Sequence, residues 1–324
     1  MSTKDKILEL LESNKGIYFS GEDLAQKLSV SRAAVWKAIK ALQSDGYTID
    51  AVTNKGYSLS VNSDILSPQG IKKYLSKDIK NLDINVLQTV DSTNTYIKDN
   101  IRSGIKDGYT VISAEQTNGI GRKGRSFFSP DNSGIYLSIF LKPKNYSAQK
   151  AVRITTMAAV AMCEAIEEVS NEEPKIKWVN DIFISGKKIC GILTQASFDL
   201  ESSTIEYAVL GVGINVYKPQ NGFPDELKDI AGYLFEDPQK DIKNKLSAAF
   251  LNHFMSIYKD TNDNKYADKY RNYSLVIGKR VIVISSTSQR EATVLSIDDE
   301  CRLNVKFDDG SVETLSSGEI SIKL

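Results

Sequence analysis

The spacing of apolar residues predicts three helices in the first 45 residues. Apolar side chains recur at helical spacing between residues 5 and 11, which forms one apolar stripe. A capping sequence at residues 20–23 opens a second, short helix, because its serine and acid can bond the free N–H groups of a first turn. Ser31 is a suitable N-cap for a third helix that runs to about Ser44.

The third predicted helix has an apolar side and a basic side. At 100° per residue its aliphatic residues fall together, whereas Arg32, Trp36, Lys37 and Lys40 fall on the opposite side with no acid among them. An ordinary solvated helix face could also carry these cations. An exposed tryptophan among them is unusual, however, unless it packs against something or binds it.

A hairpin pattern follows the third helix. Alternating stretches at residues 47–52 and 57–59 flank a turn that contains Asn54 and Gly56, with Lys55 at its tip. Three helices and a two-stranded wing predict a winged helix-turn-helix, whose last helix enters the major groove of DNA. The alternative is the same fold used as a protein–protein module. The candidate DNA-contacting residues are Ser31, Arg32, Trp36, Lys37, Lys40 and Lys55.

Strand and helix patterns alternate after a polar linker at about residues 60–68. From Ile71 to about Tyr273 this alternation predicts a mixed α/β domain. From Ile277 onward, short alternating strands separated by turns predict a small β-barrel. The sequence therefore predicts an α+β multidomain protein, with domains at residues 1–63, 64–273 and 274–324.

A glycine-rich basic loop lies at residues 116–130. It contains a G-x-G-x-x-G pattern, but a dinucleotide site would need a helix straight after the glycines, and the sequence that follows is not helical. Arg122, Lys123 and Arg125 make the loop suited to clamping a phosphate or a carboxylate. A mobile basic surface loop is the alternative. No P-loop sequence occurs in the chain.

Two further segments carry candidate chemistry. Asn180 and Asp181 end an apolar strand, and Lys187 and Lys188 return on the next hairpin, which brings acidic and basic groups to one end of a sheet. Lysines at a hairpin also occur as simple edge charges. The strand at 210–215 is interrupted by glycines, which would allow a ligand or another backbone to approach closely.

Composition narrows the chemistry further. The 324 residues carry 41 Lys and Arg against 41 Asp and Glu, so nucleic-acid binding must be confined to one surface. His253 is the sole histidine and lies in a helical pattern, which favours a structural role. The three cysteines are too scattered for C-x-x-C pairs and indicate buried thiols in a reducing compartment. No apolar run is long enough to span a bilayer, and we expect a cytoplasmic protein without membrane contact.

Taken in order, five segments resemble the biotin protein ligase family, in the class whose members carry an N-terminal helix-turn-helix and act as biotin operon repressors. The resemblance covers nearly the whole chain. Its segments are residues 91–94 (DSTN), 119–125 (GIGRKGR), 177–181 (KWVND), 188–193 (KICGIL) and 211–215 (GVGIN).

The resemblance implies a central domain of the biotin/lipoate ligase type and a C-terminal SH3-like barrel. It also implies two reactions: biotin and ATP, with Mg²⁺, form biotinyl-adenylate, and a lysine of a biotin carboxyl carrier protein then attacks it. The adenylate would act as corepressor and favour a homodimer on operator DNA.

By the same resemblance, site residues are assigned by role. Lys188, Arg122 and Asp181 would be catalytic. Biotin would contact Ser92, Thr93, Asn94, Gln116, Gly119, Ile120, Gly121, Arg122, Lys188 and Gly191. ATP or the adenylate would contact Arg122, Arg125, Lys177, Trp178, Asn180, Asn215, Glu319 and Lys323.

Two positions depart from the family pattern. The family often has arginine where Ile120 stands and proline where Val179 stands. The first departure removes a second cation from the ligand, and the second changes backbone stiffness. Two other functions fit the same segments: a ligand-sensing repressor without catalysis, and a lipoate ligase.

Overall fold

The computed structural model describes residues 1–143, 146–147, 151–199, 204–260, 265–285, 288–316 and 318–322. The chain forms two compact units. The first comprises Met1–Lys80 with Pro238–Ala248, and the second comprises Asn81–Asp237 with Ala249–Leu324. The division into three domains predicted above remains a prediction.

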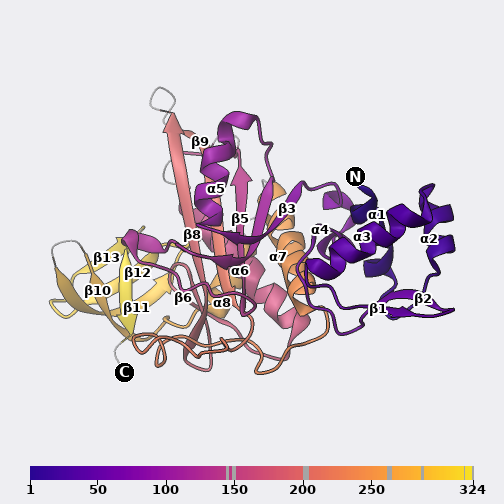
Figure 1. The fold of residues 1–324 in the computed structure, drawn as a ribbon. Coiled ribbons are helices and arrows are strands. Elements are labelled where there is room, and N and C mark those ends of the chain that lie inside the picture. The colour runs from indigo at the N-terminus through magenta and orange to yellow at the C-terminus, as the bar shows by residue number, and fades with distance from the viewer. Residues whose placement is uncertain are drawn as a thin grey trace. The chain divides into compact units, whose positions relative to one another are not determined.

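The N-terminal unit contains the winged helix-turn-helix. Its elements are α1 (Thr3–Ser13), α2 (Gly21–Leu28), α3 (Arg32–Ser44), β1 (Ile49–Val52), β2 (Gly56–Leu59), α4 (Pro68–Lys72) and the 3₁₀ turn η1 (Lys77–Ile79) (Figure 1). The predicted caps are present: Ser20 and Asp23 form a capping box, and Ser31 Oγ accepts a hydrogen bond from Ala34 N at 3.2 Å.

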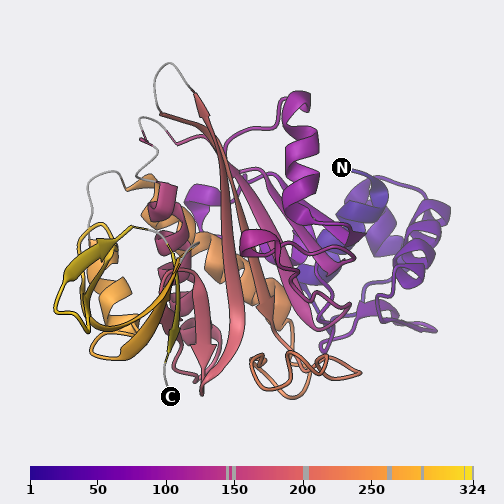
Figure 2. The same ribbon diagram turned by 90° about the vertical axis from the view of Figure 1, so that its left-hand side faces the viewer.

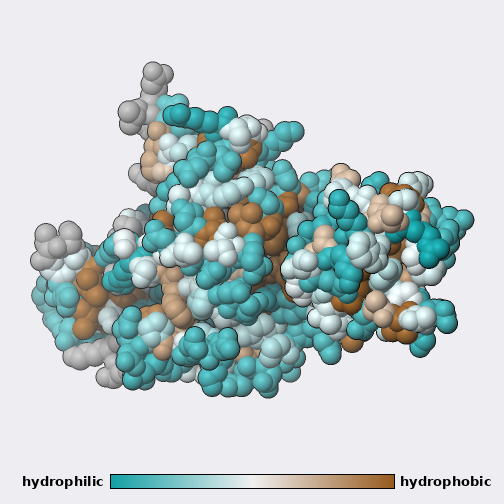
Figure 3. Space-filling model, in the orientation of Figure 1, coloured by the Kyte–Doolittle hydropathy of each residue, from teal (hydrophilic) through white to brown (hydrophobic). Residues whose placement is uncertain are grey.

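The wing forms because its turn contains residues that tolerate positive φ. Asn54 has φ 66° and Gly56 has φ 101°, which closes the hairpin between β1 and β2. A Cβ on Gly56 would lie 2.0 Å from the Phe19 carbonyl oxygen, so this glycine also lets the wing approach the chain before α2. In Figure 3, hydrophilic side chains predominate over this unit, with small separate apolar groups among them.

The N-terminal unit contains a buried ionic cluster, formed by Glu12, Lys15, Lys73 and Asp241. The carboxylates of Glu12 and Asp241 are almost fully buried. Lys15 Nζ lies 2.9 Å from Asp241 Oδ1, and Lys73 Nζ lies 3.0 Å from Glu12 Oε2 and 2.6 Å from Asp241 Oδ2. Burial would raise the pKa of Asp241, but hydrogen bonds from Lys73, Tyr74 and Lys15 outweigh it and lower that pKa.

The second unit is built on a seven-stranded sheet. Its order is β3-β4-β5-β9-β8-β7-β6; β3 and β4 are parallel and all other neighbours are antiparallel. Every residue of β5 is buried, so both faces of the sheet are covered at its centre. The strands are β3 (Ile84–Val90), β4 (Thr110–Gln116), β5 (Gly134–Leu141), β6 (Lys175–Lys177), β7 (Asp181–Ile184), β8 (Lys187–Asp199) and β9 (Thr204–Asn215).

Helices cover opposite faces of this sheet. Thr155 of α6 bonds Thr194 on β8, whereas Asn94 of α5 bonds Gln195, and successive strand residues point to opposite faces. Figure 2 shows α6 and α8 on the face away from α5. The helical elements of this part are α5 (Thr93–Asn100), η2 (Ile101–Ser103), η3 (Arg122–Gly124), α6 (Ala151–Val169), α7 (Ile242–Lys259, which begins in the first unit) and α8 (Lys265–Tyr273). The sequence pattern predicts a long helix over about residues 148–169, and its first residues, 148–150, lie outside the described residues.

The C-terminal strands form a five-stranded antiparallel sheet, which we call the barrel because it occupies the segment predicted as a small β-barrel. They pair antiparallel in the order β13-β12-β11-β10-β14, and in Figure 2 they curve strongly. Their bounds are β10 (Arg280–Ile284), β11 (Gln289–Ile297), β12 (Leu303–Phe307), β13 (Val312–Leu315) and β14 (Glu319–Ile322). Among the described residues, no helix is long and apolar enough to cross a membrane.

Candidate active site

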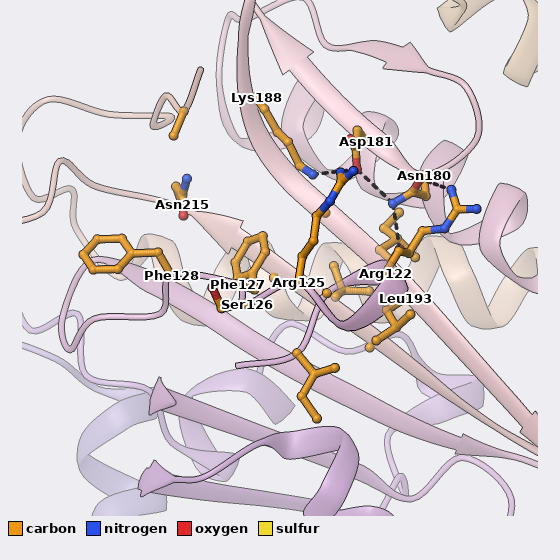
Figure 4. Close-up of a pocket in the computed structure, with 18 of the residues that line it drawn as sticks. Arg122, Arg125, Ser126, Phe127, Phe128, Asn180, Asp181, Lys188, Leu193 and Asn215 are labelled. Carbon is orange, nitrogen blue, oxygen red and sulfur yellow. Dashed lines mark hydrogen bonds and ion pairs between the residues drawn. The ribbon is translucent and has the colours of Figure 1, made fainter. Parts of the chain in front are cut away.

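A cavity of about 410 Å³ opens on the face of the large sheet that carries α5 (Figure 4). The start of α5, the basic loop at 116–130, the first residues of β8 and the end of β9 line it, together with the segment 223–231 and Ile320 of the barrel. The volume is within the usual range for pockets that enclose a small ligand.

One end of the cavity is a network of hydroxyl and amide groups. The backbone N and the Oγ1 of Thr93 donate to Gln116 Oε1 at 2.9 and 3.1 Å. Ser138 Oγ lies 2.7 Å from Thr93 Oγ1 and 2.6 Å from Asn94 Oδ1, and Asn94 Nδ2 donates to Gln195 Oε1 at 3.0 Å. Because these side chains already hold one another, this end is preorganised for a neutral polar ligand group.

The other end joins cations to an acid and an amide. Lys188 Nζ lies 2.7 Å from Asp181 Oδ1, whose oxygen also accepts from Asn180 Nδ2 at 2.9 Å. Arg122 donates to Asn180 Oδ1 at 2.7 Å and to the Gly318 carbonyl at 3.0 Å, which ties the basic loop to the barrel. The predicted convergence of acidic and basic groups at one sheet end is therefore present in the structure.

Glycines in β8 and β9 make room for side chains that cross the sheet face. A Cβ on Gly213 would lie 2.5 Å from the Phe127 ring, and one on Gly191 would lie 3.1 Å from it. A Cβ on Gly211 would lie 2.3 Å from Asn94 Oδ1. The close approach expected at 210–215 is thus made by two side chains rather than by another backbone.

The remaining predicted residues differ in their surroundings. Trp178 is only 3% exposed and its indole N–H donates to the Cys301 carbonyl at 2.9 Å, so most of the ring is packed under the barrel. Asn215 Nδ2 donates to the Gly232 carbonyl at 2.9 Å. Of the site residues predicted from the sequence, those that line the cavity are Ser92, Thr93, Asn94, Gln116, Ile120, Gly121, Arg122, Arg125, Lys177, Trp178, Asn180, Asp181, Lys188, Gly191 and Asn215.

Three predicted residues stand apart from this lining. Gly119 lies beside it, packed where a Cβ would meet the Phe127 carbonyl oxygen at 2.4 Å. Glu319 begins β14, but its side chain is outside what the structure describes, and Lys323 lies outside the described residues. Their expected contacts with the nucleotide remain predictions.

Sequence reasoning missed the apolar part of the cavity. Phe127 lies over the glycines, and Phe128 makes an edge contact with Phe223 at 6.2 Å between ring centroids. Leu227 and Ile230 add further apolar surface. The paired aromatics at 127–128, within the basic loop, were the one available signal, whereas residues 223–231 carry no recognisable motif.

The histidine and the cysteines take no part in this cavity. His253 Nε2 lies 2.9 Å from Glu168 Oε2 on α6, so the histidine links two helices. Burial raises the pKa of the Cys190 and Cys163 thiols and raises that of Cys301 to about 11. Because a thiolate is the reactive form, these cysteines are poor nucleophiles.

The N-terminal unit presents the basic face predicted for α3. Arg32, Lys37 and Lys40 are exposed, and Trp36 is 57% exposed. The face is less purely cationic than the helix alone suggests, because Arg32 Nε lies 3.7 Å from Glu22 Oε2 of α2. Both side chains are largely exposed, so water and salt weaken this pair. Lys55 at the wing tip is also exposed.

Comparison with known proteins assigns three segments of the chain to families. Residues 86–215 match the biotin/lipoate A/B protein ligase family, 3–58 match an HTH domain, and 276–323 match the biotin protein ligase C-terminal domain. The chain is 31% identical over 323 residues to the bifunctional ligase/repressor BirA of Bacillus subtilis, covering 98% of this chain and 97% of that protein. The chain belongs to the bifunctional ligase/repressor class of biotin protein ligases.

Other members of the family are consistent with this assignment. The bifunctional ligase/repressor BirA of Escherichia coli is 32% identical over 211 residues, which is 65% of this chain and 63% of that protein. A biotin protein ligase from Aquifex aeolicus, solved in complex with biotin and ATP, shares the fold with a TM-score of 0.60 at 23% identity, covering 74% of this chain and 98% of that one.

Proposed function

We propose that this chain activates biotin with ATP to biotinyl-adenylate and transfers biotin to a lysine of a biotin carboxyl carrier protein. One observation carries the proposal: a single cavity joins a polar network around Thr93 and Gln116 to a cationic end formed by Arg122 and Lys188. The polar network suits the ureido group of biotin. The cationic end suits the place where a carboxylate meets a phosphate.

In the first step an oxygen of the biotin carboxylate attacks the α-phosphorus of ATP. The bond from that phosphorus to the bridging oxygen breaks, and pyrophosphate leaves with the electron pair. Two anions must approach each other, so fixed cations at Arg122 and Lys188 lower the barrier by cancelling their repulsion. ATP enters as its magnesium complex, because Mg²⁺ binds through phosphates and water with few protein ligands.

In the second step the carrier lysine amine attacks the carbonyl carbon of the mixed anhydride. The bond from that carbon to the AMP oxygen breaks, AMP leaves, and the amine loses a proton. Asp181, which lies 2.7 Å from Lys188, either keeps Lys188 oriented or accepts that proton.

The test is to incubate the full chain with MgATP, labelled biotin and a biotin carboxyl carrier domain. We expect label on the carrier lysine and none when lipoate replaces biotin. No transfer from either acid would refute the ligase function and favour a ligand-sensing repressor. Transfer of lipoate alone would identify a lipoate ligase.

We further propose that the N-terminal unit binds operator DNA and that the chain is a biotin-dependent repressor. The exposed cations of α3, with Trp36 among them and Lys55 on the wing, support this proposal. By resemblance to its class, adenylate formation would promote a homodimer that spans two half-sites. Since ATP, the carrier protein and DNA meet in the cytoplasm, we place the protein there.

This second function is tested by selecting binding sites from a pool of random-sequence DNA duplexes, with and without biotin and MgATP. We expect a two-fold symmetric site to be enriched only when both ligands are present, together with a dimer in sedimentation. Equal binding without ligands would refute biotin-dependent repression. Absence of any enriched site would favour the protein–protein use of the winged helix.

A further inference from the structure

The segment Phe223–Gly232, which we call the pocket wall, forms the apolar side of the cavity. It contributes Phe223, Leu227, Ile230 and Ala231 to the lining. Ile230 is 53% exposed, so the wall borders solvent and has little burial of its own to hold it. What keeps this segment against the cavity must therefore come from contacts with its neighbours.

The wall ends in backbone carbonyls that point toward the start of β8. Within the wall, Leu227 N and Lys228 N bond the Pro224 carbonyl, and Ile230 N and Ala231 N bond that of Leu227. These turns leave the carbonyls of residues 228–230 without a partner inside the segment, as at the end of a helix. A cation is favoured at such a terminus.

Lys187 and the backbone of Lys188 satisfy all three carbonyls. Lys187 Nζ donates to the Asp229 carbonyl at 2.5 Å and approaches the Lys228 carbonyl at 3.4 Å. Lys188 N donates to the Ile230 carbonyl at 2.8 Å, and Gly232 N donates back to the Lys188 carbonyl at 2.8 Å. The pocket wall is thus paired with the strand that carries Lys188.

The start of β8 is held firmly enough to act as an anchor. The β7–β8 hairpin turns through Ser185 and Gly186, both at positive φ, in a tight two-residue turn that pairs Ile184 with Lys187. A Cβ on Gly232 would lie 2.7 Å from Lys187 Cβ, so the wall approaches the strand as closely as a glycine allows. Successive residues of a strand point to opposite faces, which sends Lys187 to the wall and Lys188 to the cavity.

We infer that Lys187 is a positioning residue: its contact with the pocket wall, which we call the latch, holds the wall against the cavity. The latch thereby positions the side of the site that binds the nucleotide. The inference rests on the ligase function proposed above. The wall ends at Gly232, whose carbonyl accepts a hydrogen bond from Asn215 Nδ2, and Asn215 is a residue assigned to ATP. Lys187 therefore affects the affinity for the nucleotide, whereas Lys188 affects the rate of adenylate formation.

The test compares Lys187→Met, Lys187→Arg and the control Lys228→Met in the full-length protein. Lys228→Met also removes a cation, but from a side chain 60% exposed to solvent and paired with Asp225. From the strength of a charged hydrogen bond to a carbonyl, we expect Lys187→Met to raise KM for MgATP about tenfold. The value of kcat and KM for biotin should be unchanged. Lys187→Arg should restore most of the affinity, and Lys228→Met should behave as wild type.

Hydrogen–deuterium exchange of the unliganded protein supplies a readout that is independent of activity. Peptides covering residues 223–232 should exchange faster in Lys187→Met than in Lys228→Met, because the latch is lost. If wild type transfers no biotin, the proposed function fails while the exchange result still tests the latch. Unchanged exchange, unchanged KM for MgATP, or a fall in kcat alone would each overturn the positioning role of Lys187.

Discussion

Replacing Lys188 by Met should abolish most adenylate formation while leaving the fold intact. The side chain keeps nearly the same length but loses the charge that lies 2.7 Å from Asp181. That charge faces the cavity in which a carboxylate and a phosphate are proposed to meet. Since Asp181 also accepts a hydrogen bond from Asn180, its carboxylate keeps a partner in the variant.

The size of the effect follows from electrostatics. A unit charge about 4 Å from the developing charge contributes about 4 kcal/mol at an effective dielectric constant of about 20. Removing one preorganised group that stabilises a transition state usually costs about 100- to 1000-fold in rate, which agrees with that value. We therefore expect kcat for adenylation to fall by about this factor.

The assay is biotin-dependent exchange of labelled pyrophosphate into ATP, which reports the first step without a carrier protein. Lys98→Met, on the exposed face of α5, is the control for loss of a positive charge. Exchange by Lys188→Met within about threefold of wild type, less than 1 kcal/mol, would refute the role assigned to Lys188.

A double-mutant cycle then separates the two roles left open for Asp181. If Asp181 only orients Lys188, Asp181→Asn should slow the reaction in wild type but cost nothing more in Lys188→Met. An additional loss in the transfer step, measured with preformed adenylate and carrier, would instead identify Asp181 as the proton acceptor.

Three further predictions address other parts of the chain. Gly213→Ala, whose Cβ would lie 2.5 Å from the Phe127 ring, should weaken biotin binding about tenfold in calorimetry; unchanged affinity would remove Phe127 from the pocket. Asp241→Asn should destabilise the N-terminal unit by about 3–5 kcal/mol in urea unfolding, because it leaves Lys15 and Lys73 to share the one buried carboxylate of Glu12. Folding lowers the pKa of the Asp241 carboxyl, so the stability that Asp241 contributes is present above pH 3.8 and is lost as the pH falls through the folded pKa. If Asp241→Asn unfolds in acid as wild type does, this reasoning is wrong. Arg32→Ala with Lys37→Ala should strongly weaken operator binding and reduce the salt slope of the remaining affinity by about 1.8 without affecting biotin transfer, and retained operator affinity would show that α3 is not the recognition helix.

Local signals made the N-terminal unit predictable. The caps at Ser20 and Ser31 and the turn at Asn54 act within a few residues of themselves, so their consequences are visible in the sequence. The predicted third helix is confirmed at both ends, and the wing is confirmed with small shifts at the ends of its strands. The same reasoning missed Glu22 beside Arg32, because that contact joins two helices.

The site was less predictable, because its contacts are long-range. Arg122 meets Asn180, which lies 58 residues further along the chain, and Gly318, which lies 196 residues further. Five short segments, read through their resemblance to a family, named most of the lining residues. The pocket wall was missed because its position depends on backbone carbonyls and on Lys187, and neither leaves a pattern in the sequence.

The burial of the two tryptophans gives the protein a pair of built-in fluorescent reporters. Trp36 stands 57% exposed on α3, whereas Trp178 is 3% exposed under the barrel. Emission from an indole in water is shifted to longer wavelength than emission from a buried one, so the two signals are separable by colour and by quenching with iodide. With Trp178→Phe the long-wavelength band reports DNA at α3, and with Trp36→Phe the short-wavelength band reports ligand in the cavity, so two single-tryptophan variants follow the two functions separately without any added label.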